Sequence, residues 1–277
     1  MVPPTEPVAL YKHIERAART CYRSHNRADL QSHERLIRML IARGHESMLE
    51  HSNIVLEMTP SDFYDVVDAV KLERHYLRFS EDYGVVSGNV RAFRDVIRRH
   101  PRIPFASELN RLYPLLFEDL ECKGVGMCRV IIDVKDYFAD DPEEYAKHAA
   151  VSVFFHDVDR GFTHEIVRMR SASFAQESTR WVDYAKKGVD FLYPDDLPPF
   201  LHNIYKEVYK KAEFYYGVLR GLGVPPEMAR SILPIGVMTN IVVTTTVEDW
   251  RRIIALRTAK DAHPTMRKVL ESLKGII

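Results

Sequence analysis

Apolar residues recur at helical spacing in two runs before residue 45 and then alternate with polar residues over a short stretch. The runs from Val8 to Ala17 and from Leu36 to Ile41 each mark one face of a predicted helix. Gly44 follows the second run, and because glycine adopts a left-handed backbone without strain, we expect that helix to end there. The alternation from Asn53 to Met58, closed by Pro60, predicts a strand.

The pattern between residues 61 and 150 is less regular and favours structural elaboration over chemistry. It predicts helices near 61–72, 90–99 and 106–120. Pro114 is expected to bend or interrupt the last of these, because proline cannot continue the hydrogen-bond ladder of a helix.

A second strand is predicted from Val151 to Phe155, followed by a helix that Asp159 caps and that runs to about Arg170. Its buried face is predicted to carry Phe162, Ile166 and Met169. A stripe on a different face of the same helix is formed by Arg160, His164 and Arg168.

Local signals also predict the elements after residue 190. The first is a mostly helical stretch from Asp195 to Gly223, and a short helix from Pro225-Pro226 to Arg230 follows it. A β-branched strand is predicted from Val237 to Thr244. A capping box of Thr245 and Glu248 then opens a helix through Trp250 to Arg257, and a last helix begins at Pro264. No repeat or flexible linker divides the chain. We therefore expect one α/β domain over residues 1–277.

Composition and charge narrow the class of protein. Of the 277 residues, 46% are hydrophobic and 28% charged, which is typical of a globular enzyme with a sizeable core. The 39 basic residues equal the 39 acidic ones, whereas nucleic-acid-binding proteins usually carry a basic surplus. We therefore expect a small ligand and no nucleic acid.

Cysteine usage and the distribution of apolar residues indicate a cytoplasmic protein. Cys21, Cys122 and Cys128 are too scattered for a disulfide framework or a paired metal motif. No apolar run approaches the roughly 18 to 20 residues that cross a membrane. The start M-V-P-P-T-E-P lacks the basic and apolar regions of a signal peptide.

Several arginines are flanked by apolar residues that otherwise resemble core positions, namely Arg168, Arg170, Arg180, Arg230 and Arg257. Guanidinium groups in apolar surroundings need anionic partners, and they bind phosphate in a bidentate fork. For Arg230 and Arg257 the alternative is a structural role at a helix end, with Glu227 and Asp261 as partner carboxylates.

The segment from Arg168 to Trp181, R-M-R-S-A-S-F-A-Q-E-S-T-R-W, is the strongest candidate site. Its polar side chains after the second arginine are Ser173, Gln176, Glu177, Ser178, Thr179 and Arg180. Such a run can satisfy the phosphate, sugar and base edges of a nucleotide together. A polar surface loop is the alternative interpretation.

The octapeptide G-H-E-S-M-L-E-H, from Gly44 to His51, suggests a metal site at first sight. His45 and His51 are six residues apart, however, and would point about 240° from each other on a helix. Contacts to a polar ligand or a helix-capping network are therefore favoured over metal binding.

Nucleophilic catalysis has weak support. Arg19 lies close enough in sequence to lower the pKa of the Cys21 thiol, but a small cysteine in a helix is more often structural. Ser178 lacks the G-x-S-x-G setting of a serine nucleophile. His156 and His164 are more often structural than catalytic in such positions.

The segment from Arg168 to Trp181 resembles the signature of the flavin-dependent thymidylate synthases, R-H-R-x-x-S followed by S-x-R-Y. The resemblance extends to Asp159 to Val167, to the turn Gly44 to His51, and to Val224 to Arg267 with A-R-S-I-L-P, E-D-W-R, A-L-R-T and A-H-P-T-M-R. Ser87 to Phe93 is similar to the longer members, which implies a family-variable insertion at about 59–150. The family fold is α/β, with a central, mostly antiparallel sheet flanked by helices.

The resemblance implies FAD-dependent C5-methylation of a uridine monophosphate, dUMP to dTMP, with methylenetetrahydrofolate as carbon donor and NADPH as reductant. It makes Arg257 the catalytic residue, which would polarise the uracil ring. The implied nucleotide contacts are Glu165, Arg168, Gln176, Ser178, Thr179, Arg180, Arg230 and Arg257. The implied flavin contacts are Ser47, Glu50, Arg168, Arg170 and Ser171. Family members are homotetramers with sites shared between subunits.

Three positions depart from the family pattern. Met169 replaces the central histidine, Trp181 replaces the final tyrosine, and Gln176 with Glu177 beside it stands where an acidic residue is expected. Methionine cannot hydrogen-bond as histidine does. The alternatives are a specialised paralogue that methylates UMP or hydroxymethylates the nucleotide, a catalytically weakened nucleotide- and flavin-binding protein, and a metal-dependent nucleotide hydrolase built on the octapeptide.

Overall fold

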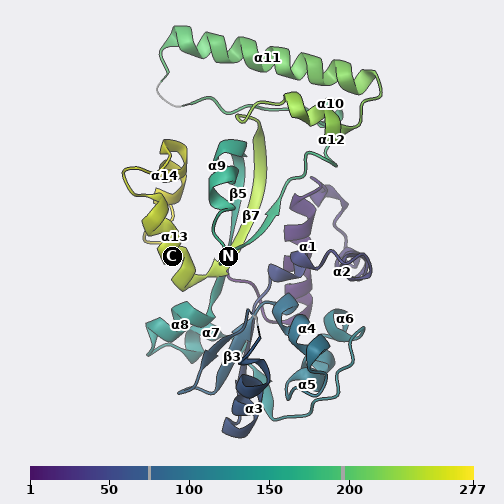
Figure 1. Cartoon of the computed structure of the whole chain (residues 1–277), viewed down its shortest axis with the longest axis vertical. Coiled ribbons are helices and arrows are strands. Elements are labelled where there is room, and N and C mark those ends of the chain that lie inside the picture. Colours follow the sequence, from purple (N-terminus) through teal and green to yellow (C-terminus); the bar gives the residue numbers. More distant parts are fainter. Residues whose placement is uncertain (74–75, 195–196) are drawn as a thin grey trace. The chain divides into compact units, whose positions relative to one another are not determined.

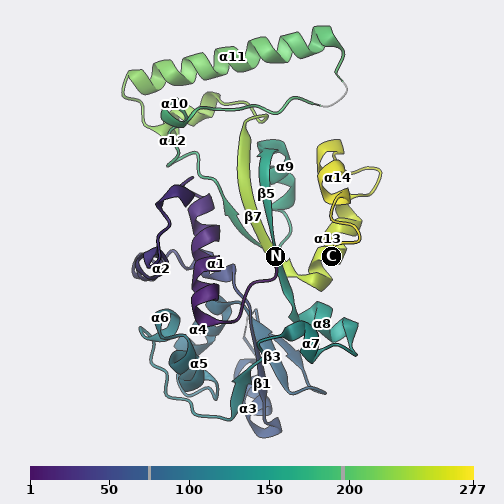
Figure 2. The same ribbon diagram turned by 180° about the vertical axis from the view of Figure 1, so that it is seen from behind.

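The computed structural model describes residues 1–73, 76–194 and 197–277. Within them the chain divides into two compact units. Unit 1 comprises Met1–Ala18, Asn26–Val153 and Thr244–Trp250, and unit 2 comprises Arg19–His25, Phe154–Val243 and Arg251–Ile277. Figures 1 and 2 show the helices and strands of both units from opposite sides.

The two helices predicted near the N-terminus are confirmed. Helix α1 (Pro7–Thr20) buries Leu10 and Ile14 completely. A short turn η1 (His25–Arg27) precedes α2 (Ser32–Ala42). Gly44 has a φ of 70°, and its amide donates to the Ile41 carbonyl at 3.0 Å. The predicted glycine end of the second helix is therefore confirmed.

A four-stranded sheet forms the centre of unit 1, in the order β2 (Arg78–Ser80), β3 (Val85–Gly88), β1 (Ile54–Met58) and β4 (Cys128–Val130). All of its pairings are antiparallel, and Leu56 lies opposite both Val86 and Val130. Strand β1 is the one predicted from alternation. Its end at a proline is also confirmed, because α3 (Pro60–Val70) begins there with Thr59 as the capping residue.

Helices from the middle of the chain complete unit 1. They are α4 (Val90–Arg99), α5 (Ala106–Leu112), α6 (Pro114–Phe117), α7 (Val134–Tyr137) and α8 (Pro142–His148). The interruption predicted at Pro114 is confirmed, since α5 ends before it and α6 begins with it. In the shared core, the rings of Phe93 and Phe105 meet edge to face at 5.2 Å.

A three-stranded sheet runs through unit 2, with β7 (Met238–Thr246) between β5 (Ala150–Asp159) and β6 (Ser173–Gln176). Both predicted strands are present and are longer than predicted. Ile241, Val242 and Val243 of β7 are fully buried, as β-branched residues in a central strand usually are. Both views show α9 (Arg160–Ile166) beside β5 and β7 (Figures 1 and 2).

Helix α9 begins as predicted but ends earlier. The Asp159 carboxylate accepts a hydrogen bond from the Phe162 amide at 2.6 Å, which confirms the cap. The helix ends at Ile166, where the amides of Arg168 and Met169 turn back to carbonyls only three residues earlier. The prediction of a helix to about Arg170 was therefore wrong, and Arg168 does not continue the stripe on the helix.

Helix α11 (Pro199–Gly221) is the long helix of unit 2, and the predicted start at Asp195 lies outside the described residues. Two of its own residues, Tyr209 and Tyr216, are buried. The Tyr209 ring stacks on Phe191 at 4.5 Å, and the Tyr216 hydroxyl accepts a hydrogen bond from the Tyr184 amide. The short helix α10 (Tyr184–Lys187) also contacts α11.

The C-terminal elements follow the predicted order. They are α12 (Pro226–Ala229), the turn η3 (Arg230–Ile232), α13 (Val247–Arg257) and α14 (Pro264–Glu271). The first turn of α13 is capped by Thr246, whose Oγ1 accepts from the Asp249 amide at 3.3 Å and donates to the Asp249 carboxylate at 3.1 Å. The capping pair therefore lies one residue beyond the predicted Thr245 and Glu248.

The predicted α/β class with antiparallel pairing is confirmed, and the described strands are divided between two sheets. The single domain over residues 1–277 stays a prediction, as do the bounds of the insertion at about 59–150.

Candidate functional site

The residue predicted to be catalytic, Arg257, is the last residue of α13 and is held by Glu165 of α9. Its Nη1 donates to Glu165 Oε2 at 2.8 Å, and its Nη2 donates to the Glu165 backbone carbonyl at 3.1 Å. Only 15% of its side chain is exposed. Its Nε is buried and has no hydrogen-bond partner among the described residues. The carboxylate partner of Arg257 is thus Glu165, a predicted nucleotide contact 92 residues away, and not Asp261, which was the expected structural partner.

Arg168 lies at the edge of the same cluster. Its Nη1 is 3.9 Å from Glu165 Oε1, and 69% of its side chain is exposed. Arg170 and Ser171, which follow it, are exposed as well. The structure therefore joins Glu165, Arg168 and Arg257, which two distant segments contribute, and leaves Arg168 accessible.

A second cluster joins the end of the signature segment to η3. Arg230 Nη1 donates to Thr179 Oγ1 at 3.0 Å, and Arg180 Nη2 lies 3.5 Å from Glu227 Oε2. Thr179 is buried, whereas Arg180 and Arg230 are exposed. Glu227, expected as a partner of Arg230, therefore pairs with Arg180.

The expectation that the five arginines lie in apolar surroundings was wrong for four of them. The side chains of Arg168, Arg170, Arg180 and Arg230 are exposed, and only Arg257 is largely buried. Their apolar sequence neighbours do not surround them, because neighbouring side chains in turns and short helices point in different directions. Exposed guanidinium groups remain accessible to an anionic ligand.

Gln176 and Ser178 lie between the clusters in sequence and are both half-buried. Gln176 Nε2 donates to Thr163 Oγ1 of α9 at 2.7 Å. The Ser178 amide donates to the Cys21 carbonyl at 2.9 Å, and its hydroxyl accepts from the Arg180 amide at 3.4 Å. The strand and turn that carry these side chains are thereby tied to α9 and to the segment of residues 19–25.

Glu177 is the residue in this segment whose role the sequence did not reveal. Its side chain is fully buried and accepts hydrogen bonds from Arg23 Nε at 2.6 Å, Tyr184 Oη at 2.6 Å and Asn240 Nδ2 at 3.2 Å. Its backbone carbonyl accepts from Arg160 Nη2 at 2.7 Å. Glu177 is therefore an internal anchor of the segment. The one signal available was its place between a strand and a polar run.

The predicted flavin contacts Ser47 and Glu50 lie in unit 1, on the turn η2 (Glu46–Glu50). Ser47 is exposed, and Glu50 Oε1 accepts from Arg91 Nη1 at 2.6 Å. Their partners in the flavin set, Arg168, Arg170 and Ser171, belong to unit 2.

Glu46, Glu50 and His51 of the octapeptide make separate contacts. Glu46 pairs with Arg94 and Arg98, and the buried His51 Nδ1 lies 2.8 Å from Thr244 Oγ1. His45 is exposed. Across the described part of the chain, no group of three or more His, Cys, Asp or Glu side chains is placed to hold a metal ion.

The thiol considered as a nucleophile is poorly suited to that role. Burial raises the pKa of the Cys21 thiol to about 11, and the charge of Glu177 adds to the shift. The pKa of this thiol is therefore raised, and not lowered as its closeness in sequence to Arg19 suggested. His156 and His164, considered as bases, are both exposed.

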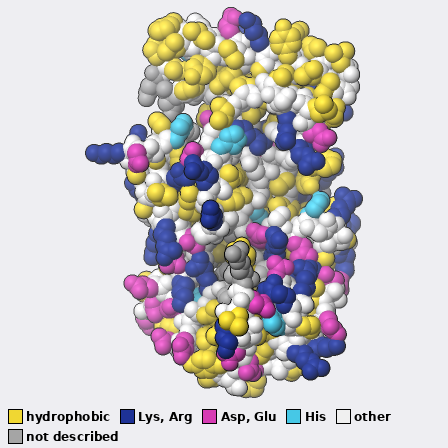
Figure 3. All heavy atoms as spheres, in the orientation of Figure 1, with side chains coloured by type: hydrophobic (Ala, Val, Ile, Leu, Met, Phe, Trp, Pro, Cys, Tyr) yellow, Lys and Arg dark blue, Asp and Glu magenta, His cyan; other side chains and the backbone are white. Residues whose placement is uncertain are grey.

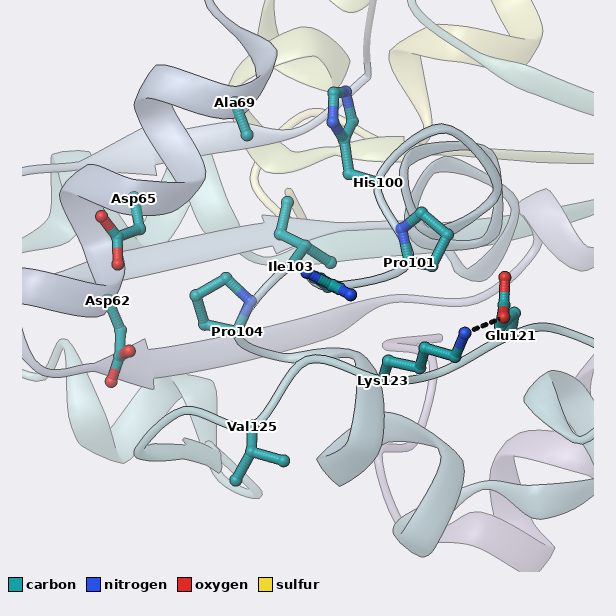
Figure 4. Close-up of a pocket in the computed structure, with 11 residues that line it drawn as sticks. Asp62, Asp65, Ala69, His100, Pro101, Ile103, Pro104, Glu121, Lys123 and Val125 are labelled. Atoms are coloured by element: carbon teal, nitrogen blue, oxygen red, sulfur yellow. Dashed lines mark ion pairs between the residues drawn. The ribbon is translucent and has the colours of Figure 1, made fainter.

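The two described cavities of unit 1 contain none of the predicted site residues. The larger, of about 570 Å³, has Asp62 and Asp65 on one side and Lys123, paired with Glu121, on the other (Figure 4). The smaller, of about 420 Å³, lies around Phe138. Among the described helices, none is both long and apolar enough to cross a lipid bilayer.

A family model described as thymidylate synthase complementing protein matches residues 10–89 and 134–277, which is well over half of the chain. The chain therefore belongs to the thymidylate synthase complementing protein family. The residues left unmatched in the middle, 90–133, lie inside the predicted insertion.

Named relatives agree with this family. The chain is 34% identical over 139 residues to a flavin-dependent thymidylate synthase of Sulfurisphaera tokodaii. The aligned region covers 47% of this chain and 52% of the relative. A protein of the same name from Mycobacterium marinum is 31% identical over 173 residues, covering 56% and 66%. The chain thus spans about half of the length of the archaeal relatives that it matches.

A solved structure of thymidylate synthase X from Helicobacter pylori with FAD and dUMP is also similar. It is 16% identical, with a TM-score of 0.42, and the match covers 52% of this chain and 74% of that one. A likeness of this size carries no argument about function.

Proposed function

We propose that this protein catalyses the FAD-dependent C5-methylation of a uridine monophosphate, converting dUMP to dTMP in the cytoplasm. Methylenetetrahydrofolate would supply the carbon, and NADPH would supply the reducing equivalents. Membership of the family and the signature from Arg168 to Trp181 support this reaction.

The observation that carries the proposal is the meeting of Arg257 with Glu165 beside Arg168. Glu165 uses both its carboxylate and its backbone carbonyl to orient the guanidinium of Arg257. A fixed cation of this kind can face the uracil carbonyl and N3, and it stabilises the negative charge that develops as C5 becomes nucleophilic.

The second cluster supplies groups for the nucleotide phosphate. Arg180 and Arg230 are exposed, and Thr179 holds Arg230 in place at 3.0 Å. In this proposal Ser178 and Gln176 complete the nucleotide contacts. Arginine is favoured for this task because its planar fork matches phosphate oxygens.

The proposed flavin contacts fit an anionic cofactor in part. Arg168 and Arg170 present exposed guanidinium groups suited to a pyrophosphate, with Ser171 next to them. Ser47 is accessible, while Glu50 must share its carboxylate with Arg91. When bound, FAD would pass the reducing equivalents of NADPH to the transferred carbon. No cysteine nucleophile is required, which agrees with the raised pKa of Cys21.

We also propose that the active protein is a homotetramer whose sites combine residues of several chains. The two clusters of unit 2 and the turn that carries Ser47 and Glu50 are then contributed to shared sites by neighbouring subunits.

The test is an absorbance spectrum of the purified protein reconstituted with FAD, followed by product analysis. A flavin band that NADPH bleaches, together with dTMP formed from dUMP and methylenetetrahydrofolate, is expected. A protein that does not bind FAD, or that binds it and forms no methylated nucleotide, contradicts the proposal.

Met169 favours a second candidate function. In it, the protein is a specialised paralogue that methylates UMP or transfers a hydroxymethyl group to the nucleotide. Met169 is half-buried, and its thioether cannot make the hydrogen bonds of the family histidine. Parallel assays with dUMP and UMP separate the candidates, because exclusive dTMP formation eliminates the second. Activity that appears only in Met169→His would identify a catalytically weakened protein instead.

A further inference from the structure

The turn η2, which carries two of the proposed flavin contacts, is held in place by helix α4. The Arg94 side chain of α4 is fully buried, and its Nη2 donates to Glu46 Oε1 of the turn at 3.2 Å. The Val90 amide, at the start of α4, donates to Ser52 Oγ, just after the turn, at 2.9 Å. Buried hydrogen bonds therefore fix α4 and η2 to each other within unit 1.

Arg91, one turn before Arg94, reaches η2 as well. Its Nη1 donates to Glu50 Oε1 at 2.6 Å, and its Nε lies 3.7 Å from Asp95 Oδ2. Arg94 is completely buried, whereas 44% of the Arg91 side chain is exposed. Basic and acidic side chains lie next to each other on the surface where Figure 1 places α4 (Figure 3). Two carboxylates thus orient the Arg91 guanidinium and leave part of it accessible.

The charge of Glu50 limits what it can contact in the cofactor. FAD contains a pyrophosphate, and a carboxylate placed directly against this anion is repelled by it. The other proposed flavin contact on the turn, Ser47, is neutral and exposed. Neither side chain supplies the positive charge that an anion requires. Arg91, which Glu50 holds beside the turn, does supply it.

Arg98, two turns after Arg91 on α4, also reaches η2, but its guanidinium is more fully engaged. Its Nη1 donates to Asp95 Oδ1 at 2.8 Å, and its Nη2 donates to Glu46. The Arg91 guanidinium donates to Glu50, and its Nη2 has no hydrogen-bond partner among the described residues. Arginine binds phosphate best through two parallel N–H donors. Arg91 is therefore better placed than Arg98 to bind an anionic ligand.

We propose that Arg91 binds the pyrophosphate of FAD and that Glu50 is a positioning residue, which acts on the cofactor through Arg91. This inference rests on the proposed function, because it requires FAD at η2. It adds a residue to the proposed flavin contacts and gives Glu50 a role that fits its charge. Arg91 lies among residues 90–133, which the family model leaves unmatched, so the family match does not supply this contact.

The first test is the dissociation constant for FAD, measured by quenching of flavin fluorescence. Arg91→Met should raise this constant about 10- to 100-fold, the effect of losing a charge-assisted hydrogen bond. Arg99→Met is the matched control, because Arg99 lies on the same helix, is 42% exposed and pairs with Glu73, outside η2. This control should stay within twofold of the wild type. An Arg91→Met variant with the wild-type constant overturns the inference.

A double-mutant cycle tests the role of Glu50. Glu50→Ala should weaken FAD binding in the wild type and have no further effect in the Arg91→Met background, because both changes remove the same contact. A Glu50 side chain that contacts FAD directly gives additive losses, which contradict the positioning role. The dissociation constant of the wild type should also rise more steeply with salt than that of Arg91→Met, because salt screens a charged contact. Equal salt dependence contradicts a contact with pyrophosphate.

Substrate kinetics identify the anion that Arg91 binds. At saturating FAD, the KM values of Arg91→Met for dUMP and NADPH should remain within twofold of the wild type. A raised KM for dUMP with an unchanged dissociation constant for FAD assigns Arg91 to another anion and overturns the inference.

Two further measurements keep these results interpretable. Arg91 is partly exposed, so the circular dichroism spectrum of Arg91→Met should match that of the wild type. Arg91→Lys keeps the charge without the planar fork and should bind FAD with an intermediate dissociation constant. A wild type that does not bind FAD contradicts the proposed function and this inference with it. A wild type and an Arg91→Met variant that bind FAD equally contradict this inference alone.

Discussion

Arg23 Nε lies 2.6 Å from Glu177 Oε2, and this ion pair connects the turn after α1 to the signature segment. Glu177 is fully buried, while 24% of the Arg23 side chain is exposed. The backbone of Arg23 has a φ of 44°, a left-handed conformation that is uncommon for residues other than glycine. The guanidinium also lies over the ring of Tyr184, 5.4 Å from its centre. The carboxylate of Glu177 therefore accepts hydrogen bonds from three side chains, those of Arg23, Tyr184 and Asn240.

Replacing Glu177 with alanine should lower the free energy of unfolding by about 3 kcal/mol. The change leaves Arg23 without its counter-ion and removes the acceptor for Tyr184 and Asn240. Urea denaturation measures this, and Glu227→Ala, which breaks an exposed ion pair, should cost less than about 1 kcal/mol. Equal effects of the two substitutions would show that burial does not strengthen the internal pair.

Replacing Arg257 with alanine should reduce turnover of dUMP by about 100- to 1,000-fold while the flavin spectrum is retained. The expected loss is that of a donor which stabilises charge in the transition state. Steady-state kinetics with FAD-loaded protein measures it. Arg251→Ala, an exposed position on the same helix, should stay within twofold of the wild type. A comparable loss in that control would indicate damage to α13 instead of lost chemistry.

Stability should decrease as the pH falls from about 6.5 towards 4. Burial, with the charges of the N-terminus and Arg16, lowers the pKa of His13 to about 4, and burial also lowers the pKa of His148. The unfolded chain, with histidine pKa values near 6.5, then binds more protons than the folded chain in this window. The contribution of these histidines to the free energy of unfolding is therefore complete above about pH 6.5 and decreases below it. At pH 5, the pKa difference of His13 alone should lower the free energy of unfolding by about 2 kcal/mol.

Urea midpoints at pH 7.5 and pH 5 check this pH dependence. His13→Gln can keep a hydrogen bond to Ser152, which His13 Nε2 makes at 3.0 Å, and it cannot titrate. That variant should show a weaker pH dependence than the wild type. An unchanged slope would exclude His13 as a contributor.

All three thiols should react slowly with a disulfide reagent at pH 7.5. Burial raises the pKa of Cys21 to about 11 and that of Cys128 to about 12, and it also raises the pKa of Cys122. Because the thiolate is the reactive form, Cys21 should react about 100-fold more slowly in the folded protein than in urea. Rapid modification of Cys21, or loss of turnover in Cys21→Ser, would reopen the possibility of a cysteine nucleophile.

Elements governed by neighbouring residues were predictable from the sequence. The end of α2 at Gly44, the cap of α9 at Asp159 and the break at Pro114 each depend on backbone geometry within about four positions. The wrong predictions concerned the residues at which two helices begin or end. The cap of α13 moved from Thr245 to Thr246, and α9 stopped at Ile166, because an apolar pattern does not define the residue at which a helix begins or ends.

Contacts between distant segments were not predictable in the same way. The signature segment was recognisable as a candidate site, yet the sequence could not show that Glu177 is an internal anchor for Arg23. Glu165, which precedes the signature segment, and Glu177, which lies within it, cannot be told apart by residue type. Only the folded chain distinguishes Glu165, which orients Arg257, from Glu177, which is buried and accepts a hydrogen bond from the Tyr184 hydroxyl.

The sequence alone determined most of the helices and strands, the family signature and the set of residues that can bind an anion, because propensity, capping and motif chemistry act over short stretches of chain. The tertiary structure decided which of these residues meet and which arginines are exposed. Those outcomes depend on packing between segments as far apart as Glu165 and Arg257, and the spacing of residues along one segment contains no record of that packing.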